Sequence, residues 1–329
     1  MRLLYELRRL LLTEPEIQPK HQRLAYTALT AVCFFWGTTY LGIRISLESI
    51  PPFYLIASRY VISGAILLVA AVVCGAHLPR GRELLYTALC GVICIGVGNT
   101  LLAITEEWIP SGLAALFYTT SPFWMVGIDA LLPAGRRPVP STAAGLLVGL
   151  SGVICLVVPS AVREGLGGGT LAAFLLLQLS GIGWALGSLL QKRVHSRVHP
   201  FVSGAVQQLA AGLAVFIPAL LFEHAPRAIT VRSSIAVCYL IVFGSLIGFS
   251  SFIYAMARLP VAMVSIYIFV NPVVAVCLGW LFFREPFGRR ELSAMLIIFV
   301  GVALVRWSES NRRASASVPA ADEVGAIPD

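Results

Sequence analysis

Residues 24–44, LAYTALTAVCFFWGTTYLGIR, are followed after a short gap by residues 53–74, FYLIASRYVISGAILLVAAVVC. Each stretch is mostly apolar over close to 20 residues, the length that crosses a hydrocarbon core of about 30 Å as a helix. Backbone N–H and C=O groups need internal partners in lipid, so both stretches are expected to be helical. They predict an all-α membrane protein.

The rest of the chain repeats this pattern. Hydrophobic residues make up 58% of the 329 residues and charged residues 12%, with a mean hydropathy of +0.85. A soluble domain carries about 25% charged residues. The apolar blocks predict ten transmembrane helices, at 24–44, 53–74, 84–105, 110–132, 140–159, 170–191, 201–222, 233–256, 260–283 and 289–307.

The net charge of +8 comes largely from Arg residues in the short loops between these blocks. With the N-terminus inside, 16 Lys and Arg residues fall on the cytoplasmic face and 7 on the other. This bias predicts that both termini are cytoplasmic. Lipid headgroups therefore explain the charge better than nucleic acid does.

Neither tail indicates a further domain. Residues 1–23 are expected to form a cytoplasmic segment and residues 308–329 a disordered cytoplasmic tail. The seven Cys residues lie in or beside apolar blocks without a Cys-x-x-Cys pair, so we expect packing roles and neither metal site nor cofactor. These residues are Cys33, Cys74, Cys90, Cys94, Cys155, Cys238 and Cys277.

The second half of the chain repeats landmarks of the first. Trp36 and Trp184 are 148 residues apart, and Pro110 and Pro260 are 150 apart. Further pairs keep the same order and nearly the same offset: Pro52–Phe53 with Pro200–Phe201, Gly98 with Gly248, Ser121–Pro122 with Asn271–Pro272, and Gly152 with Gly301. We therefore predict one five-helix repeat at 24–159, a Gly-rich linker at 160–169 and a second repeat at 170–307.

An odd number of spans in each repeat fixes their relative orientation. If the first repeat begins inside the cell, the second must begin outside, so the two are inverted with respect to the membrane. Many secondary transporters are built from inverted repeats, with the solute site near the midplane between the halves. The duplication itself therefore indicates transport.

Several motifs also resemble the EamA family of the drug/metabolite transporter superfamily. They are FFWGTTYLGIRISLESIPPFYLIASRYVISG, GVGNTLLAITEEWIPSGLAALFYTTSP and the stretch from GSLIGFSSFIYAMARLPVAMVSIYIFVNP to residue 307. The resemblance covers roughly residues 27–307 and implies a ten-helix inner-membrane carrier that exports amino acids, metabolites or drugs. One departure is that Glu285, in REPF, has no acidic counterpart in PAGRRP of the first repeat.

Proline in the middle of two predicted spans marks the first candidate site. Pro122 and Pro272 would each remove a helical hydrogen bond and break the helix, freeing carbonyls for a cavity; packed structural kinks are the alternative. Breaks at matching positions of two repeats favour a binding site. The polar neighbours expected to line it are Tyr118, Thr119, Thr120 and Ser121, with Ser265, Tyr267 and Asn271 from the second repeat.

Trp36 and Trp184 lie near mid-depth of spans one and six, away from the interfaces where Trp is usual. Their indole N–H groups need partners, which fits either a cavity wall that faces water or solute or a helix-packing contact. Thr39, Tyr40 and Ser188 lie one turn away. Asn99, Ser250, Ser251 and Tyr254 could add polar groups to the cavity or form interhelical hydrogen bonds.

Few ionisable groups fall inside the predicted spans. Arg59 lies in span two, where a charge costs on the order of 3 kcal/mol unless it is paired or snorkels. Its repeat counterpart is Gln207, so the charge is not duplicated. Asp129 lies near the end of span four, and Glu106 is the candidate carboxylate for proton coupling or gating, with a solvated loop position as the alternative.

These features predict a secondary active carrier that works by alternating access, with protons as a candidate coupling ion. That it exports amino acids or related small organic molecules is what the resemblance implies. A nucleotide-sugar carrier of the same superfamily is the alternative, and a basic central cavity would favour it. A membrane-embedded enzyme would need converging catalytic groups, whereas the spans offer a lone Asp129. The oligomeric state is left as monomer or homodimer.

Overall fold

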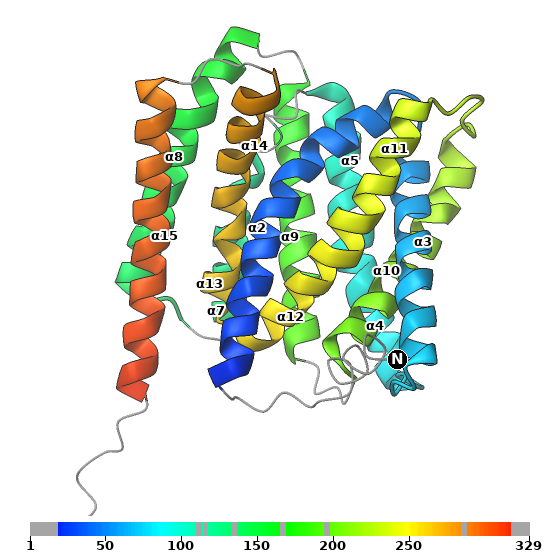
Figure 1. The fold of residues 1–329 in the computed structure, drawn as a ribbon, viewed down its shortest axis with the longest axis horizontal. Helices are drawn as coiled ribbons and strands as arrows, with labels where there is room; N and C mark the ends of the chain where they lie inside the picture. Colours follow the sequence, from blue (N-terminus) through cyan, green and yellow to red (C-terminus); the bar gives the residue numbers. More distant parts are fainter. Residues whose placement is uncertain are drawn as a thin grey trace, which may run out of the picture.

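The computed structural model describes residues 19–109, 114, 117–132, 137–164, 169–193, 198–283 and 288–316, and every regular element in these ranges is a helix (Figure 1). Residues 1–18, Pro110, Glu285 and the chain end from residue 317 lie outside the described residues. The helices run alongside one another and the short connections lie at the two ends of the bundle.

The helices are α2 (Pro19–Leu47), α3 (Pro52–Val73), α4 (Arg82–Gly91), η1 (Val92–Val97), α5 (Gly98–Trp108), α7 (Ser121–Leu131) and α8 (Pro140–Glu164) in the first half. In the second half they are α9 (Thr170–Arg193), α10 (Pro200–Phe222), α11 (Val231–Tyr239), η2 (Leu240–Phe249), α12 (Ser250–Arg258), α13 (Val261–Ser265), α14 (Tyr267–Phe283) and α15 (Arg289–Ala316).

Seven described helices are long and apolar enough to cross a membrane. They are Gln22–Leu47, Pro52–Val73, Arg82–Trp108, Thr170–Arg193, Pro200–Phe222, Val231–Arg258 and Leu292–Arg312. Large apolar side chains on their outer surfaces are exposed, as lipid contact requires, among them Val73, Leu171 and Phe222. The protein is thus a multi-pass membrane protein, and ten spans remain the sequence prediction.

The start of α3 and the start of α10 show why the same local sequence recurs. Pro52 and Pro200 each occupy the first turn, where a missing N–H costs nothing and the fixed φ suits a helix. The residue before each proline, Pro51 or His199, is extended. The repeated Pro-Phe therefore marks equivalent helix starts in the two halves.

Equivalent helices of the two halves pack against each other in antiparallel pairs. In the α3–α10 pair, a Cβ on Gly64 would lie 2.5 Å from the Leu209 nitrogen, and one on Gly212 would lie 2.6 Å from the Val61 nitrogen. Residues further along α3 thus contact residues earlier in α10, so the two helices run in opposite directions. The missing side chains let the two backbones approach closely.

The α8–α15 pair follows the same antiparallel pattern. Gly145 approaches Val305, Gly152 approaches Ile298, and Gly301 approaches the Gly149 nitrogen.

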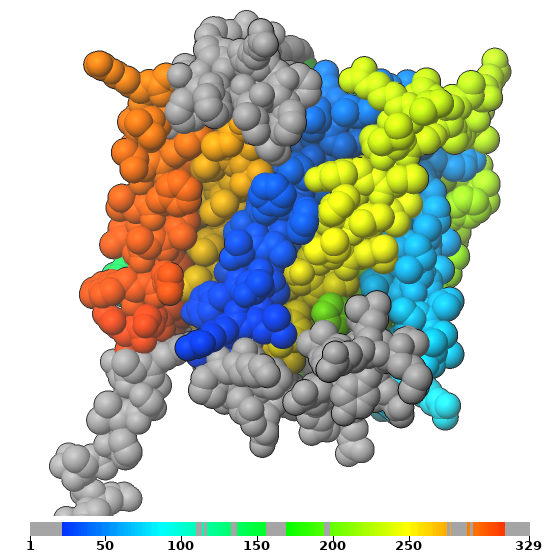
Figure 2. All heavy atoms as spheres, in the orientation of Figure 1, coloured from blue at the N-terminus to red at the C-terminus, as the bar shows by residue number. Residues whose placement is uncertain are grey.

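The first helix of each half packs into the opposite half. α2 contacts α14, α12 and η2, while α9 contacts the corresponding α7, α5 and η1. Figure 2 shows one side of this arrangement, with α2 lying between α14 and the Val231–Arg258 helix. The two halves are thus related by approximate two-fold symmetry, and their interface runs through the centre of the bundle.

Two details of the backbone differ from a simple ten-helix picture. The third and eighth spans each contain a π-helical segment, η1 and η2, at matching positions. The break in span nine lies at Ile266, before Pro272, which sits inside α14. Pro122 occupies the first turn of α7, directly after a turn at residues 119–120 that separates α7 from the helical residues 117–118.

The last helix is longer than the sequence indicates. α15 continues to Ala316, so residues 308–316 are helical where a disordered tail was expected. The reason is tertiary contact: Ser308 and Glu309 are buried, and the Thr142 hydroxyl lies 2.8 Å from Ser308 Oγ and donates to Glu309 Oε1 at 3.2 Å. Partners on α8 satisfy polar groups that would otherwise favour solvent.

Candidate functional site

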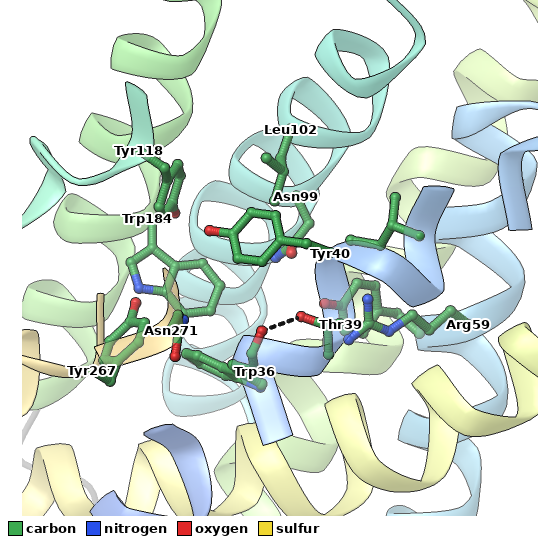
Figure 3. Close-up of a pocket in the computed structure, with 12 residues that line it drawn as sticks. Trp36, Thr39, Tyr40, Arg59, Asn99, Leu102, Tyr118, Trp184, Tyr267 and Asn271 are labelled. Carbon is green, nitrogen blue, oxygen red and sulfur yellow. Dashed lines mark hydrogen bonds between the residues drawn. The ribbon is translucent and has the colours of Figure 1, made fainter. Parts of the chain in front are cut away.

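A cavity of about 50 Å³ lies between the two halves (Figure 3). This volume holds a few water molecules. The first half contributes side chains from α2, α3 and α5 together with Tyr118, and the second half contributes side chains from α9 and α14. The lining residues are Trp36, Thr39, Tyr40, Ile43, Arg59, Tyr60, Asn99, Leu102, Tyr118, Trp184, Tyr267 and Asn271.

Many of the residues singled out from the sequence meet in this cavity. Those that line it are Trp36, Thr39, Tyr40, Asn99, Tyr118, Trp184, Tyr267 and Asn271. Trp36 and Trp184, which are equivalent in the two repeats, face each other with ring centroids 5.2 Å apart. The repeat pattern therefore brings equivalent residues to one place, and their binding roles remain a prediction.

An aromatic cluster forms one wall of the cavity. The Trp36 ring lies 5.0 Å from Tyr267 and 5.2 Å from Phe252, measured between centroids. Trp184 lies 5.2 Å from Phe252. The Trp36–Tyr267 contact is edge-to-face, and the two Phe252 contacts are tilted; aromatic pairs of this kind stabilise a cluster beyond the area they bury.

The two indole N–H groups differ in their bonding. Trp36 Nε1 donates to the Gly244 carbonyl at 2.9 Å, within the π-helical segment η2. A side chain on Gly248 would collide with the same nitrogen. Trp184 Nε1 is buried near the Tyr267 hydroxyl, and it forms no hydrogen bond of regular geometry with the described residues. Trp36 is therefore fixed by a carbonyl of the scaffold, whereas the Trp184 nitrogen lies against another cavity-lining residue.

Asn271 links the two halves at the beginning of α14. With its amide nitrogen turned toward the carbonyl oxygens around it, Asn271 donates to Tyr267 O at 2.9 Å and to Cys33 O at 3.1 Å. The amide thus ties α14 to α2 and leaves Oδ1 as an acceptor. On the other side of the interface, Asn99 Nδ2 is buried without a partner in the described part of the chain.

Arg59 lies in the cavity wall; the sequence offered it as the one basic residue that could reach a central cavity, but it was not among the predicted site residues. The residue is 3% exposed, Nε donates to Ser245 Oγ at 2.8 Å, and the guanidinium carbon lies 4.8 Å from the Tyr60 ring centroid. Tyr60, Ile43 and Leu102 were also missed. A charge inside a span is itself a functional signal, but the absence of a charged counterpart at Gln207 hid its importance.

Glu106 is buried in α5, so the alternative interpretation as a solvated loop residue is wrong. The side chain is 3% exposed, and neither carboxylate oxygen has a hydrogen-bond partner among the residues described. Its electrostatic neighbours are Tyr40, which lines the cavity, and Arg44. The carboxylate therefore lies beside the cavity wall without contributing to its lining.

Three of the proposed site residues lie outside the cavity lining. Ser188 Oγ is 3.3 Å from Cys94 Sγ, so its hydroxyl is engaged between helices. Tyr254 lies under the Arg258 guanidinium, 3.7 Å from ring centroid to carbon. Ser121 Oγ is buried and unpartnered in the described structure, close to Gly181.

The two mid-span prolines also stand back from the cavity. Neither Pro122 nor Pro272 belongs to its lining, although Ser121 and Asn271 immediately precede them.

Comparison with known proteins gives consistent matches along the whole bundle. A family model described as "EamA-like transporter family" matches residues 23–158 and again 171–307. The chain is 34% identical over 284 residues to the inner membrane transporter YedA of Escherichia coli, covering 85% of this chain and 90% of that protein.

Two further matches extend the comparison. A Streptantibioticus cattleyicolor protein named "Probable terminal-alkyne amino-acid exporter" is 27% identical over 302 residues, covering 90% of this chain and 97% of that protein. A solved crystal structure has a TM-score of 0.71 at 22% identity, covering 88% of this chain and 99% of the other. This structural match speaks for the fold alone.

Proposed function

The chain belongs to the EamA-like transporter family of the drug/metabolite transporter superfamily, and from this premise we propose that it is a secondary active carrier exporting amino acids or related small organic molecules. The observation that supports the proposal best is the cavity between the two halves, with equivalent Trp36 and Trp184 in contact across it. Carriers built from repeats bind solute at such an interface.

The antiparallel pairing of equivalent helices supports an inverted relation between the halves. If α3 and α10 both cross the membrane, they cross it in opposite directions. Two inverted halves can exchange conformations, so that the cavity opens to one side and then to the other. We propose this exchange as the transport cycle, in a bacterial inner membrane with both termini in the cytoplasm.

The size of the cavity fits a closed step of this cycle. A volume of about 50 Å³ holds a few water molecules, and most of the residues around it are buried. We propose that the halves separate to admit a solute. Contacts that join the halves at one end, such as the Arg193–Asp129 ion pair of 2.8 Å, would have to break during that movement.

We propose Glu106 as the proton-coupling group. A buried carboxylate without hydrogen-bond partners is costly when ionised, so its protonation state should follow the access of water to the cavity. Tyr40 lines the cavity and interacts electrostatically with Glu106. It could therefore transmit a change in the charge of Glu106 to a bound solute. The chain itself would need no cofactor.

A nucleotide sugar is a poorer fit than an amino acid. Its diphosphate calls for several cations, and Arg59 is the single Lys or Arg among the cavity-lining residues. The enzyme alternative lacks support from the relatives, which are named transporters.

A flux assay on the purified protein in lipid vesicles tests the proposal. Vesicles would be loaded with a mixture of radiolabelled amino acids, and release would be followed with and without a proton gradient. We expect release of some of them, faster with the gradient. Equal retention by protein-containing and empty vesicles would contradict the carrier proposal, and chemical conversion of a solute without release would favour the enzyme.

A further inference from the structure

Arg59 is a charged side chain enclosed near the centre of a membrane protein. It lies in α3, is 3% exposed and forms part of the cavity wall. A charge in a membrane span is costly unless another group compensates it. The compensation that Arg59 receives from the protein therefore indicates what the cavity is built to bind.

That compensation is incomplete in the described structure. Arg59 donates one hydrogen bond, from Nε to Ser245 Oγ, and its guanidinium approaches the Tyr60 ring. No Asp or Glu oxygen of the described chain lies within 4.0 Å of it, and the buried Glu106 carboxylate is likewise unpaired. A guanidinium carries five N–H donors, so both Nη groups remain available.

The surroundings make room for this guanidinium. A Cβ on Gly244 would lie 2.5 Å from Arg59 Nη2, so any side chain there would displace the charge. The neighbouring Ser245 supplies the hydroxyl that orients Nε. Two consecutive residues of η2 thus accommodate and orient a side chain from the other half of the protein.

The cavity has a charged side and an aromatic side. Figure 3 shows Arg59 and Thr39 on one side, Trp184 and Tyr267 on the other, and Tyr40 and Asn99 between them. A solute that fits this arrangement has one anionic group and an apolar body.

We propose that Arg59 binds the carboxylate of the transported solute. Its two Nη groups match the two oxygens of a carboxylate in a bidentate pair. The solute class is then a small organic acid with an apolar or aromatic body, such as an amino acid with an apolar side chain. This inference rests on the proposed transport function and adds the chemical group that the carrier recognises.

Matched pairs of ligands test the inference while the solute itself is still unidentified. The thermal unfolding midpoint of the purified full-length protein would be measured with L-phenylalanine and L-phenylalaninamide, and with L-leucine and L-leucinamide. Each pair differs at the carboxylate. We expect the acids to raise the midpoint and the amides to bind at least about tenfold more weakly, as expected from the loss of a charge-assisted bidentate contact.

Variants then assign the effect to one residue. Arg59→Gln should weaken acid binding by about tenfold to a hundredfold and abolish the preference over the amide, while Arg59→Lys should keep part of it. Arg232→Gln, which removes a charge from an exposed position, should leave both unchanged. The ligand comparison on the unaltered protein remains decisive if Arg59→Gln does not fold.

Equal binding of acids and amides, binding of neither acid, or an unaltered preference in Arg59→Gln would overturn the carboxylate assignment. Transport is measured separately with the acid that binds. Preference for the acid without any flux would overturn the carrier function and leave Arg59 as a carboxylate site. Flux without a preference for the acid would support the carrier function and overturn Arg59 as a carboxylate site.

Discussion

Arg59 and Gln207 occupy equivalent positions in α3 and α10, and their surroundings differ. Arg59 reaches the cavity and bonds to Ser245 of the opposite half. Gln207 is fully buried, its side chain donates to Ser203 on its own helix, and its backbone lies directly against Gly91. The same helix pair therefore holds a charged group on one side of the symmetry axis and a packing group on the other.

A second pair shows the same asymmetry. Glu106 in α5 corresponds, at the offset of the nearby glycines and prolines, to Met256 in α12, and both side chains are 3% exposed. By contrast, Trp36 and Trp184 keep the same residue type and meet at the interface. Duplication thus accounts for the scaffold and the aromatic contact, whereas Arg59 and Glu106 have the uncharged counterparts Gln207 and Met256 in the second half.

The largest effect is expected where the two halves are alike. Trp36→Ala removes the ring that contacts Trp184, Tyr267 and Phe252, and should abolish efflux from vesicles without lowering the amount of protein in the membrane. Trp307→Ala is the matched control, because Trp307 is exposed on α15. Full efflux by Trp36→Ala would remove the aromatic cluster from the site.

Asn271→Ala tests the polar half of the same contact. It removes the amide that joins α14 to α2, and it should also abolish efflux with unchanged membrane abundance. If both Trp36→Ala and Asn271→Ala transport normally, the solute binds somewhere other than this cavity.

The next effect concerns a charge that only the first half carries. Glu106→Gln should keep solute exchange in the absence of a gradient and lose about tenfold or more of the acceleration by a proton gradient, because the amide cannot release a proton. Glu107→Gln, at the exposed neighbouring position, serves as the control. Gradient-driven efflux that survives in Glu106→Gln would exclude this carboxylate as the coupling group.

The sequence predicted the symmetric part of the molecule well. Hydropathy predicted helices, and the repeat placed Trp36 and Trp184 at equivalent positions, which meet at the interface. These features depend on composition and on constant offsets, which are visible along the chain. The rotation of a helix about its axis is encoded only loosely when most of its faces are apolar. The sequence could therefore name Arg59 as a candidate for the cavity but could not show that its side chain forms part of the wall.

The asymmetric part required the tertiary structure. The π-helical segments η1 and η2 have no distinctive residue pattern, and the Gly244 carbonyl in η2 is used by Trp36 from another helix. The burial of Glu106 depends on how deeply α5 sits in the bundle. Ser308 likewise stays helical because Thr142 lies beside it. Each outcome is decided by contacts between residues far apart in the sequence.

Gly244→Ala asks whether room for the guanidinium matters. The added Cβ would lie 2.5 Å from Arg59 Nη2, so the charge must shift, and we expect carboxylate binding to weaken by about five- to tenfold. Gly127→Ala is the matched control, because a Cβ there meets nothing within 4 Å. Equal carboxylate affinities of the two variants in titrations would show that Arg59 does not need this space.

The antiparallel helix pairs should respond alike to a smaller perturbation. In α8–α15, Gly301→Ala places a Cβ against the Gly149 backbone, and in α3–α10, Gly212→Ala places one 2.6 Å from the Val61 nitrogen. Each should lower the free energy of unfolding by about 1–3 kcal/mol, measured by chemical denaturation in detergent. If either variant is as stable as Gly127→Ala, the helix pair that carries it is less tightly packed than the other helix pair.

The smallest effect separates the two equivalent helix starts. His199 precedes α10 and accepts from the Phe201 N–H at 3.4 Å, whereas the equivalent Pro51 before α3 has no side-chain acceptor. Burial, together with the Arg258 guanidinium, lowers the pKa of His199 from 6.5 to about 4. Between these values the unfolded chain binds more protons, so the contribution to stability is present above pH 6.5 and is lost as the pH falls toward 4.

Replacing His199 should therefore flatten the pH dependence of unfolding. His199→Gln is expected to reduce the loss of stability between pH 7 and pH 5 by no more than about 1 kcal/mol, since a partly exposed group is screened by solvent. His224→Gln, at an exposed position, controls for the loss of a histidine. If His199→Gln keeps the pH profile of the unaltered protein, as the control His224→Gln should, then His199 makes no pH-dependent contribution to stability at the start of α10.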